Sequence, residues 1–313
     1  MVATSLRRMN SHLAHRRLPC TCLLLGALLS ACRPQLPTTA PASAPASAAV
    51  PKRIIAIAPN AAEIIAALGE TKRLVGVGDF CKWPPELAAL PRVGGLFDTN
   101  LEAVLRLQPD LLIMRGRNDA LERLCADRGI RVYHDPTETF DDIYGTLHEL
   151  GDLLDRRAAA DAIERDMRRR LERITAAVAG RPRPRVFITL ARNPDSPANI
   201  LTATKRTFIH EVIALAGGEN VFADLAMDYP QVSPEAVLAA KPDVIIEAMP
   251  EAQPTPELTQ TVRALWRKLG PIPAVENDRV YLLTEENALV PSPRIVDIVA
   301  RVARWLHPDA NID

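Results

Sequence analysis

The chain has 313 residues, of which 48% are apolar and 24% are charged, and its formal net charge at pH 7 is zero. This composition is typical of a globular protein with one large domain or two ordinary ones, and it excludes global disorder. No basic excess is available to neutralise a phosphate backbone, so nucleic acid is not an expected partner.

The first 31 residues are typical of a bacterial secretory signal. They carry arginines and no acidic residue, and the apolar run that follows is too short to span a bilayer. The run ends in Leu29-Ser30-Ala31-Cys32, which resembles a lipobox. We therefore predict a lipoprotein signal peptide at 1–31 and lipidation at Cys32. The alternative is an ordinary signal peptide followed by an incidental cysteine.

Residues 32–51 are dominated by Pro, Ala, Ser and Thr and contain almost no large apolar residue. Such a segment cannot bury a core, so we expect an extended tether. Together with the signal, it predicts a protein held by a lipid anchor at an envelope membrane, on its periplasmic side. Arg33 stands where an acidic residue would signal retention at an inner membrane, which favours the outer membrane in a cell that has one.

Residues 52–151 alternate between branched apolar runs and segments with helical spacing, and are expected to form an N-terminal lobe. The alternation predicts a parallel sheet covered by helices. The expected strands are 53–59, 73–80, 110–114 and 130–134, and the expected helices are 60–70, 100–109 and 119–129.

Residues 181–313 repeat this order and are expected to form a C-terminal lobe. The phrase NLEAVLRLQPDLLIM, which begins at Asn100, returns as SPEAVLAAKPDVIIE, which begins at Ser233, and the triplet Arg-Val-Tyr occurs at 131–133 and at 279–281. The expected strands are 185–191, 220–226, 243–249 and 278–284, and the expected helices are 207–219, 233–242 and 257–269.

Residues 152–180 are predicted to form a long helix between the lobes. Residues 152–179 contain no Gly or Pro and are rich in Ala, Leu, Arg and Glu, which are strong helix formers. A single helix of this length would span roughly 40 Å. The sequence thus predicts an α/β protein with two Rossmann-like lobes joined by a stiff helix that limits opening and closing.

Ligands of open α/β sheets bind beyond the carboxyl ends of the strands, where the loops of the two lobes would face each other. Few residues are aromatic, yet Phe80, Trp83, Phe97 and Tyr229 fall in these loops. Exposed aromatic rings suit a broad, flat and partly apolar ligand. The alternative is that these rings cap the ends of the two cores.

The mature chain retains two cysteines, Cys81 and Cys125. They either form a disulfide, which an oxidising compartment permits, or are two independent core residues. The histidines show no spacing of metal ligands, and no nucleophile elbow, His-Glu-x-x-His motif or P-loop is present. We therefore expect no resident metal, no cofactor and no catalysis.

Residues 52–308 resemble the cobalamin-type members of the periplasmic binding protein family. The resemblance lies in RIIAIAPNAAEIIAALG, LVGVGDFCKWPPE, RVGGLFDTNLEAVLRLQPDLLI, TFIHEVIALAGGENVFAD, YPQVSPEAVLAAKPDVII and DRVYLL. It implies the helix-linked (class III) fold, a monomer, a small-molecule metal chelate as ligand, and an ABC permease dimer with its ATPase as partner. Cobalamin or a related corrinoid is the expected ligand. The alternatives are a ferric siderophore or haem and, less in keeping with the loops, a bare metal ion.

The resemblance also implies roles for individual residues. Glu102 and Glu235 match the two glutamates that dock onto permease arginines, although each is also suited to complement a helix dipole. Phe80 matches an aromatic that contacts cobalamin, and Tyr229 matches a tryptophan. Leu96 and Arg115 stand where related proteins have tryptophans, and an arginine there suits an anionic chelate. The predicted ligand-binding residues are Asn60, Phe80, Trp83, Leu96, Phe97, Arg115, Tyr229 and Asn287.

Overall fold

The computed structural model describes residues 49–250 and 252–312, so the predicted signal peptide and Cys32 lie outside the described residues. The described chain contains two four-stranded sheets in which every pairing is parallel. The first sheet has the order β2-β1-β3-β4, and the second has the order β10-β9-β5-β7. The strands are β1 (Ile54–Ala56), β2 (Leu74–Val77), β3 (Leu111–Arg115), β4 (Arg131–Asp135), β5 (Arg185–Thr189), β7 (Glu219–Asn220), β9 (Val244–Ala248) and β10 (Val280–Leu283).

Read from its other edge, the second sheet has the order β7-β5-β9-β10. This is the order of the first sheet, with β5, β7, β9 and β10 in the places of β1, β2, β3 and β4. The predicted repeat of two α/β lobes is therefore confirmed. The structure differs at 220–226, where the expected strand is reduced to the two residues of β7, and it adds a short antiparallel pair. That pair consists of β6 (Ile200–Leu201) and β8 (Gln231–Val232).

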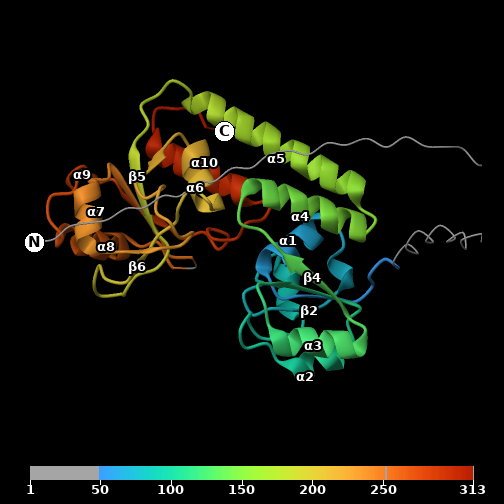
Figure 1. Cartoon of the computed structure of the whole chain (residues 1–313). Coiled ribbons are helices and arrows are strands. Elements are labelled where there is room, and N and C mark those ends of the chain that lie inside the picture. Colours follow the sequence, from blue (N-terminus) through green and yellow to red (C-terminus); the bar gives the residue numbers. More distant parts are fainter. Residues whose placement is uncertain (1–48, 251, 313) are drawn as a thin grey trace, which may run out of the picture. The chain divides into compact units, whose positions relative to one another are not determined.

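Helices cover both sheets (Figure 1). The N-terminal lobe contains α1 (Pro59–Ala67), α2 (Leu101–Leu107), α3 (Asp119–Arg128) and α4 (Phe140–Leu153), with short 3-10 turns at Thr71–Arg73 and Pro85–Ala89. The C-terminal lobe contains α6 (Phe208–Leu215), α7 (Pro234–Ala240), α8 (Pro256–Arg267), α9 (Pro273–Glu276) and α10 (Ile295–Leu306). Helix α5 (Arg157–Val178) connects the lobes. Among the described residues, no helix is both long and apolar enough to cross a membrane.

The connecting helix differs from its prediction. Residues 152–180 do not form one helix, because α4 ends at Leu153 and α5 begins at Arg157. Between them Leu154 is buried and Asp155 takes a left-handed backbone conformation (φ 59°), which turns the chain back on itself. A Cβ atom at Gly151 would lie 2.8 Å from that of Ala160, so this glycine allows α4 and α5 to pack closely.

Side chains of the N-terminal sheet alternate between two hydrophobic clusters. Ile54 and Ala56 pack on one face with α1 and α4, whereas Ile55 and Ile57 pack on the other face with α2 and α3. Cys81 belongs to the first cluster and Cys125 to the second, and both are free thiols. The considered Cys81–Cys125 disulfide is therefore absent, because the sheet separates the two residues.

The phrase that occurs twice in the sequence builds the same helix-to-strand unit in each lobe. The side chains of Asn100 and Ser233 cap α2 and α7 by accepting hydrogen bonds from backbone N–H groups three residues later, at 3.0 and 3.2 Å. Both helices end in a left-handed residue, with φ of 46° at Gln108 and 45° at Lys241.

The Pro-Asp pair that follows each helix joins it to the first strand of its lobe. The carboxylates of Asp110 and Asp243 accept hydrogen bonds from the backbone N–H groups of Arg53 and Arg185, at 3.0 and 2.9 Å. Most of the repeated phrase is thus explained by folding. Each copy also carries an exposed glutamate in its first helical turn, where a carboxylate complements the helix dipole.

Candidate ligand site between the lobes

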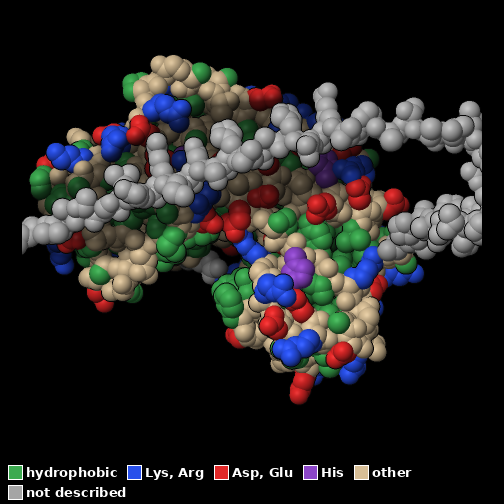
Figure 2. Space-filling model, viewed as in Figure 1, with side chains coloured by type: hydrophobic (Ala, Val, Ile, Leu, Met, Phe, Trp, Pro, Cys, Tyr) green, Lys and Arg blue, Asp and Glu red, His purple; other side chains and the backbone are tan. Residues whose placement is uncertain are grey.

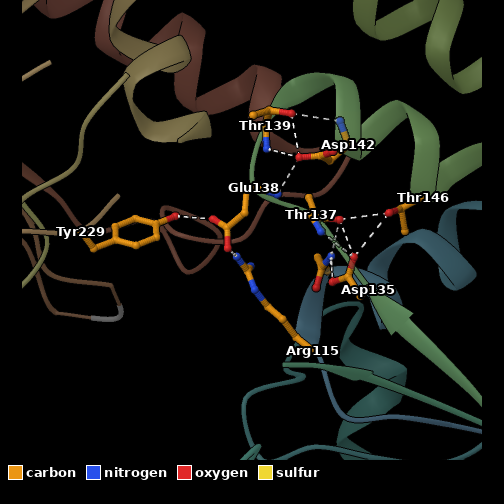
Figure 3. A network of polar contacts seen from close by, with 9 residues as sticks. Arg115, Asp135, Thr137, Glu138, Thr139, Asp142, Thr146 and Tyr229 are labelled. Atoms are coloured by element: carbon orange, nitrogen blue, oxygen red, sulfur yellow. Dashed lines mark hydrogen bonds and ion pairs between the residues drawn. The ribbon is translucent and has the colours of Figure 1, made fainter. Parts of the chain in front are cut away.

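Two of the predicted ligand residues meet where the lobes touch, and a third residue joins them. Arg115 is the last residue of β3 in the N-terminal lobe, and Tyr229 lies just before β8 in the C-terminal lobe. Both bind the carboxylate of Glu138, which lies between β4 and α4 (Figure 3). We call Arg115, Glu138 and Tyr229 the interlobe junction. Figure 2 shows the surface notched between the lobes, with acidic and basic side chains along the notch.

The two oxygens of Glu138 have different partners. Oε1 forms an ion pair with the guanidinium of Arg115, and Oε2 accepts a hydrogen bond from the Tyr229 hydroxyl at 3.0 Å. Burial lowers the pKa of Arg115, but the hydrogen bond and charge of Glu138 outweigh it and raise this pKa. Burial, and then the charge of Glu138, raise the pKa of Tyr229. Arg115 therefore keeps its positive charge, which the carboxylate of Glu138 balances, and Tyr229 keeps its phenolic proton.

Asn60 and Asn287 are both buried and hydrogen-bonded within the protein, and their contact with a ligand stays a prediction. Asn60 is 2% exposed and donates a hydrogen bond to Asp135 at 2.7 Å, within a buried network that also includes Thr137 and Thr146. Asn287 is 6% exposed and donates to the backbone oxygen of Arg294 at 3.2 Å. Both amides satisfy polar groups of the protein itself.

The predicted aromatic contacts divide into exposed and engaged residues. Phe80 is 69% exposed and Phe97 is 95% exposed, and both lie on loops of the N-terminal lobe that begin beyond β2. Leu96 is partly buried against the core beneath these loops. The ring of Trp83 lies under the guanidinium of Arg294, with 4.2 Å from ring centre to Arg294 Cζ. Trp83 therefore has a partner within the protein, whereas Phe80 and Phe97 present their rings to solvent.

A hollow of about 560 Å³ lies at the carboxyl ends of β5 and β9 in the C-terminal lobe. Its wall includes a buried ion pair, in which Arg192 and Glu247 lie 2.5 Å apart, and Glu247 also accepts a hydrogen bond from the indole of Trp266 at 2.8 Å. Neither Arg192 nor Glu247 was predicted as a site residue. No group of three or more potential metal ligands occurs among the described residues.

Glu102 and Glu235 occupy matching positions, each the second residue of its helix and each exposed. Neither forms an ion pair with any described residue. Hydrogen bonds from its own backbone N–H and from Ser233 lower the pKa of Glu235, which keeps this carboxylate charged. Two exposed anions at equivalent places on the two lobes are suited to a partner that carries two matching cations.

Two parallel-sheet lobes, a helical connection and a polar junction at the strand ends define a helix-linked binding protein. The sequence model of the periplasmic binding proteins matches residues 54–287, and the chain belongs to this family. It is therefore a binding protein and not an enzyme, as expected.

The chain is similar to proteins that are named for the binding of vitamin B12 or haem. The chain is 32% identical over 258 residues to the vitamin B12-binding protein of Vibrio cholerae, covering 82% of this chain and 89% of that protein. The structure of the periplasmic vitamin B12-binding protein BtuF of Vibrio cholerae matches with a TM-score of 0.69 and 30% identity, covering 82% of this chain and 97% of BtuF. A periplasmic haem-binding protein of Pseudomonas aeruginosa matches with a TM-score of 0.73 and 26% identity, covering 83% and 94% of the two chains.

Proposed function

We propose that this protein captures cobalamin or a related corrinoid between its lobes and delivers it to an ABC permease. The observation that carries the proposal is the pair of exposed rings, Phe80 and Phe97, on the loops of the N-terminal lobe. Each exposed phenylalanine leaves apolar surface in water, and apolar surface on the loops of an α/β lobe is suited to contact with a ligand. A corrin ring is broad, flat and partly apolar, and the 32% identity to a vitamin B12-binding protein supports this ligand.

Delivery uses Glu102 and Glu235 as the two docking groups. Their equivalent places on the two lobes support recognition of a two-fold permease, in which each subunit offers arginines to one carboxylate. Lipidation of Cys32 holds the protein at the envelope membrane, on the periplasmic side and preferably at the outer membrane. Residues 32–51 serve as the tether of a monomer.

Haem or a ferric siderophore is the second candidate ligand. It is supported by the likeness to the haem-binding protein of Pseudomonas aeruginosa and by Arg115, because an arginine suits the carboxylates of an anionic chelate. Against it stands the ion pair that already occupies Arg115.

Calorimetric titration of the purified protein with cyanocobalamin, haemin and a ferric hydroxamate in parallel tests the proposal. We expect one-to-one binding of cyanocobalamin and no heat with the other two. Binding of haemin or the hydroxamate with no response to cyanocobalamin would overturn the corrinoid and support the second candidate.

A further inference from the structure

The side chain of Glu138 contacts two of the predicted ligand residues, Arg115 and Tyr229, which belong to different lobes. Its side chain is 39% exposed and that of Arg115 is 28% exposed, so both groups are within reach of a molecule bound between the lobes. Glu138 was not among the predicted site residues. Its position depends on contacts with Tyr229 that cross 91 positions of the sequence.

The backbone of Glu138 is held from both lobes. Its N–H donates to the carboxylate of Asp142 at 3.0 Å, and its carbonyl oxygen accepts from the N–H of Phe208 at 2.6 Å. Phe208 is the first residue of α6 in the C-terminal lobe. The carboxylate therefore has a defined place, and it does not need to be recruited when a ligand arrives.

The charges at the junction disfavour an anion. Arg115 is the cation that an anionic chelate would use, and Glu138 already neutralises it. Asp135 adds a second carboxylate nearby, buried at 4% exposure within its own hydrogen-bonding network. A ligand carboxylate that approached Arg115 would have to displace Glu138 and face like charges in a partly desolvated place. A ligand amide would instead donate its N–H to Glu138 and leave the ion pair intact.

We infer that Glu138 is a specificity-determining residue that selects macrocycles with amide-bearing edges and rejects macrocycles with carboxylate-bearing edges. This inference rests on the proposed function, since it concerns the same site. Selection then depends on the negative charge of Glu138. This charge counters the preference for anions that Arg115 alone would confer. Discrimination of this kind comes from a repulsive element as well as an attractive one.

The test compares ligands that share a macrocycle and differ in whether its edge carries carboxylates. The first pair is cobinamide, whose corrin edge carries amides, and cobyrinic acid, whose corrin edge carries carboxylates. The second pair is haemin dimethyl ester and haemin. The ester offers no N–H to Glu138, so this pair tests the rejection of carboxylates alone. For each pair the ratio of dissociation constants is measured by titration of the wild type, Glu138→Gln and Arg115→Gln.

We expect the wild type to favour the member of each pair that lacks edge carboxylates by more than tenfold. Glu138→Gln should reduce that ratio by about tenfold, because it frees Arg115 for a carboxylate, and Arg115→Gln should increase it, because Glu138 then stands uncompensated. A merely structural role would move both affinities together and leave the ratio unchanged. The opposite signs of the two variants keep the test decisive even where one of them folds poorly.

Glu219→Gln serves as the matched control, because Glu219 also pairs with an arginine, Arg185, but at the amino ends of the strands. Its ratio should equal that of the wild type. An unchanged ratio in Glu138→Gln, with both ligands still bound, would overturn the inference while leaving the proposed function intact. Binding of the haemin pair alone would overturn the corrinoid proposal, and the haemin ratio would still test Glu138. A protein that binds neither pair would overturn both.

Discussion

The guanidinium of Arg294 binds the buried carboxylate of Glu63 across 231 positions of the sequence, with Nε 2.9 Å from Oε2. Glu63 is 3% exposed on α1 of the N-terminal lobe, and Arg294 immediately precedes α10 of the C-terminal lobe. The hydroxyl of Ser292 donates to the same carboxylate, and the ring of Trp83 lies under Arg294. The first helix of one lobe is thus tied to the last helix of the other, in addition to the connection through α5.

Loss of this tie should destabilise the protein strongly. Arg294→Met leaves the buried carboxylate of Glu63 without its cation, and we expect a loss of about 2–4 kcal/mol in the free energy of unfolding, measured by urea titration. Arg169→Met removes an exposed partner of Asp166 and should cost less than about 1 kcal/mol. Equal losses in the two variants would show that the Glu63–Arg294 pair contributes no more than a surface pair.

The docking glutamates should matter for the permease and not for the ligand. We expect Glu102→Ala combined with Glu235→Ala to abolish retention on the detergent-solubilised permease and to leave ligand affinity unchanged, because both carboxylates are exposed on helix starts. Glu257→Ala is the matched control, since Glu257 is also exposed at the second position of a Thr-capped helix. Retention of the double variant at the level of Glu257→Ala would refute the docking role.

The exposed rings should contribute to binding and hardly to folding. Phe80→Ala and Phe97→Ala should each change the free energy of unfolding by less than about 0.5 kcal/mol, because neither ring is buried. Each should weaken cyanocobalamin binding by about tenfold or more, through lost contact with the apolar face of the ligand. Val50→Ala, a truncation at another exposed apolar position, should leave affinity unchanged. Affinity that survives both phenylalanine changes would place the ligand elsewhere.

Cys81 and Cys125 should be unreactive and unpaired in the folded protein. Burial raises the pKa of Cys81 to about 12 and also raises the pKa of Cys125, so neither thiol forms the reactive thiolate near neutral pH. We expect iodoacetamide to modify neither residue in the native protein and both after unfolding without reductant, as measured by peptide mass mapping. Peptides of the two residues linked to each other would contradict the structure.

Glu211 should give a pH-dependent contribution to stability. Burial raises the pKa of this carboxyl, although its carboxylate accepts a hydrogen bond from the backbone N–H of Phe140 at 2.7 Å. The folded protein therefore holds the proton more tightly than the unfolded chain, so stability falls as pH rises from about 4.3, the usual glutamate value, through the folded pKa. At pH values below the pKa of Glu211 in the unfolded chain, this loss of stability is absent.

Glu211→Gln keeps an oxygen for the Phe140 N–H and removes the titration. Its stability relative to the wild type should therefore increase as pH rises through this window, as measured by urea midpoints at several pH values. Glu257→Gln, at an exposed helix start, should show no such trend. If the stability difference between Glu211→Gln and the wild type stays constant with pH, the Glu211 carboxyl is not the source of a pH-dependent contribution.

Much of the architecture could be predicted because it is encoded locally. Branched apolar runs alternating with helical spacing indicated the two sheets, and the phrases that begin at Asn100 and Ser233 indicated two lobes of one design. The same local reasoning placed Glu102 and Glu235 in the first turns of their helices. It failed at 152–156, where a left-handed residue, Asp155, ends one helix before the next begins, because nothing in that helix-forming composition marks a turn.

The sequence by itself determined the family, the order of the elements and the place of Phe80 and Phe97 on exposed loops. Only the tertiary structure decided which polar side chains turn inward and which meet across the lobes. Asn60 and Asn287 turn inward, Cys81 and Cys125 lie on opposite faces of a sheet, and Glu138 joins Arg115 to Tyr229. The reason is physical: a buried polar group must find a partner, and here that partner lies up to 231 positions away, beyond the reach of any local pattern.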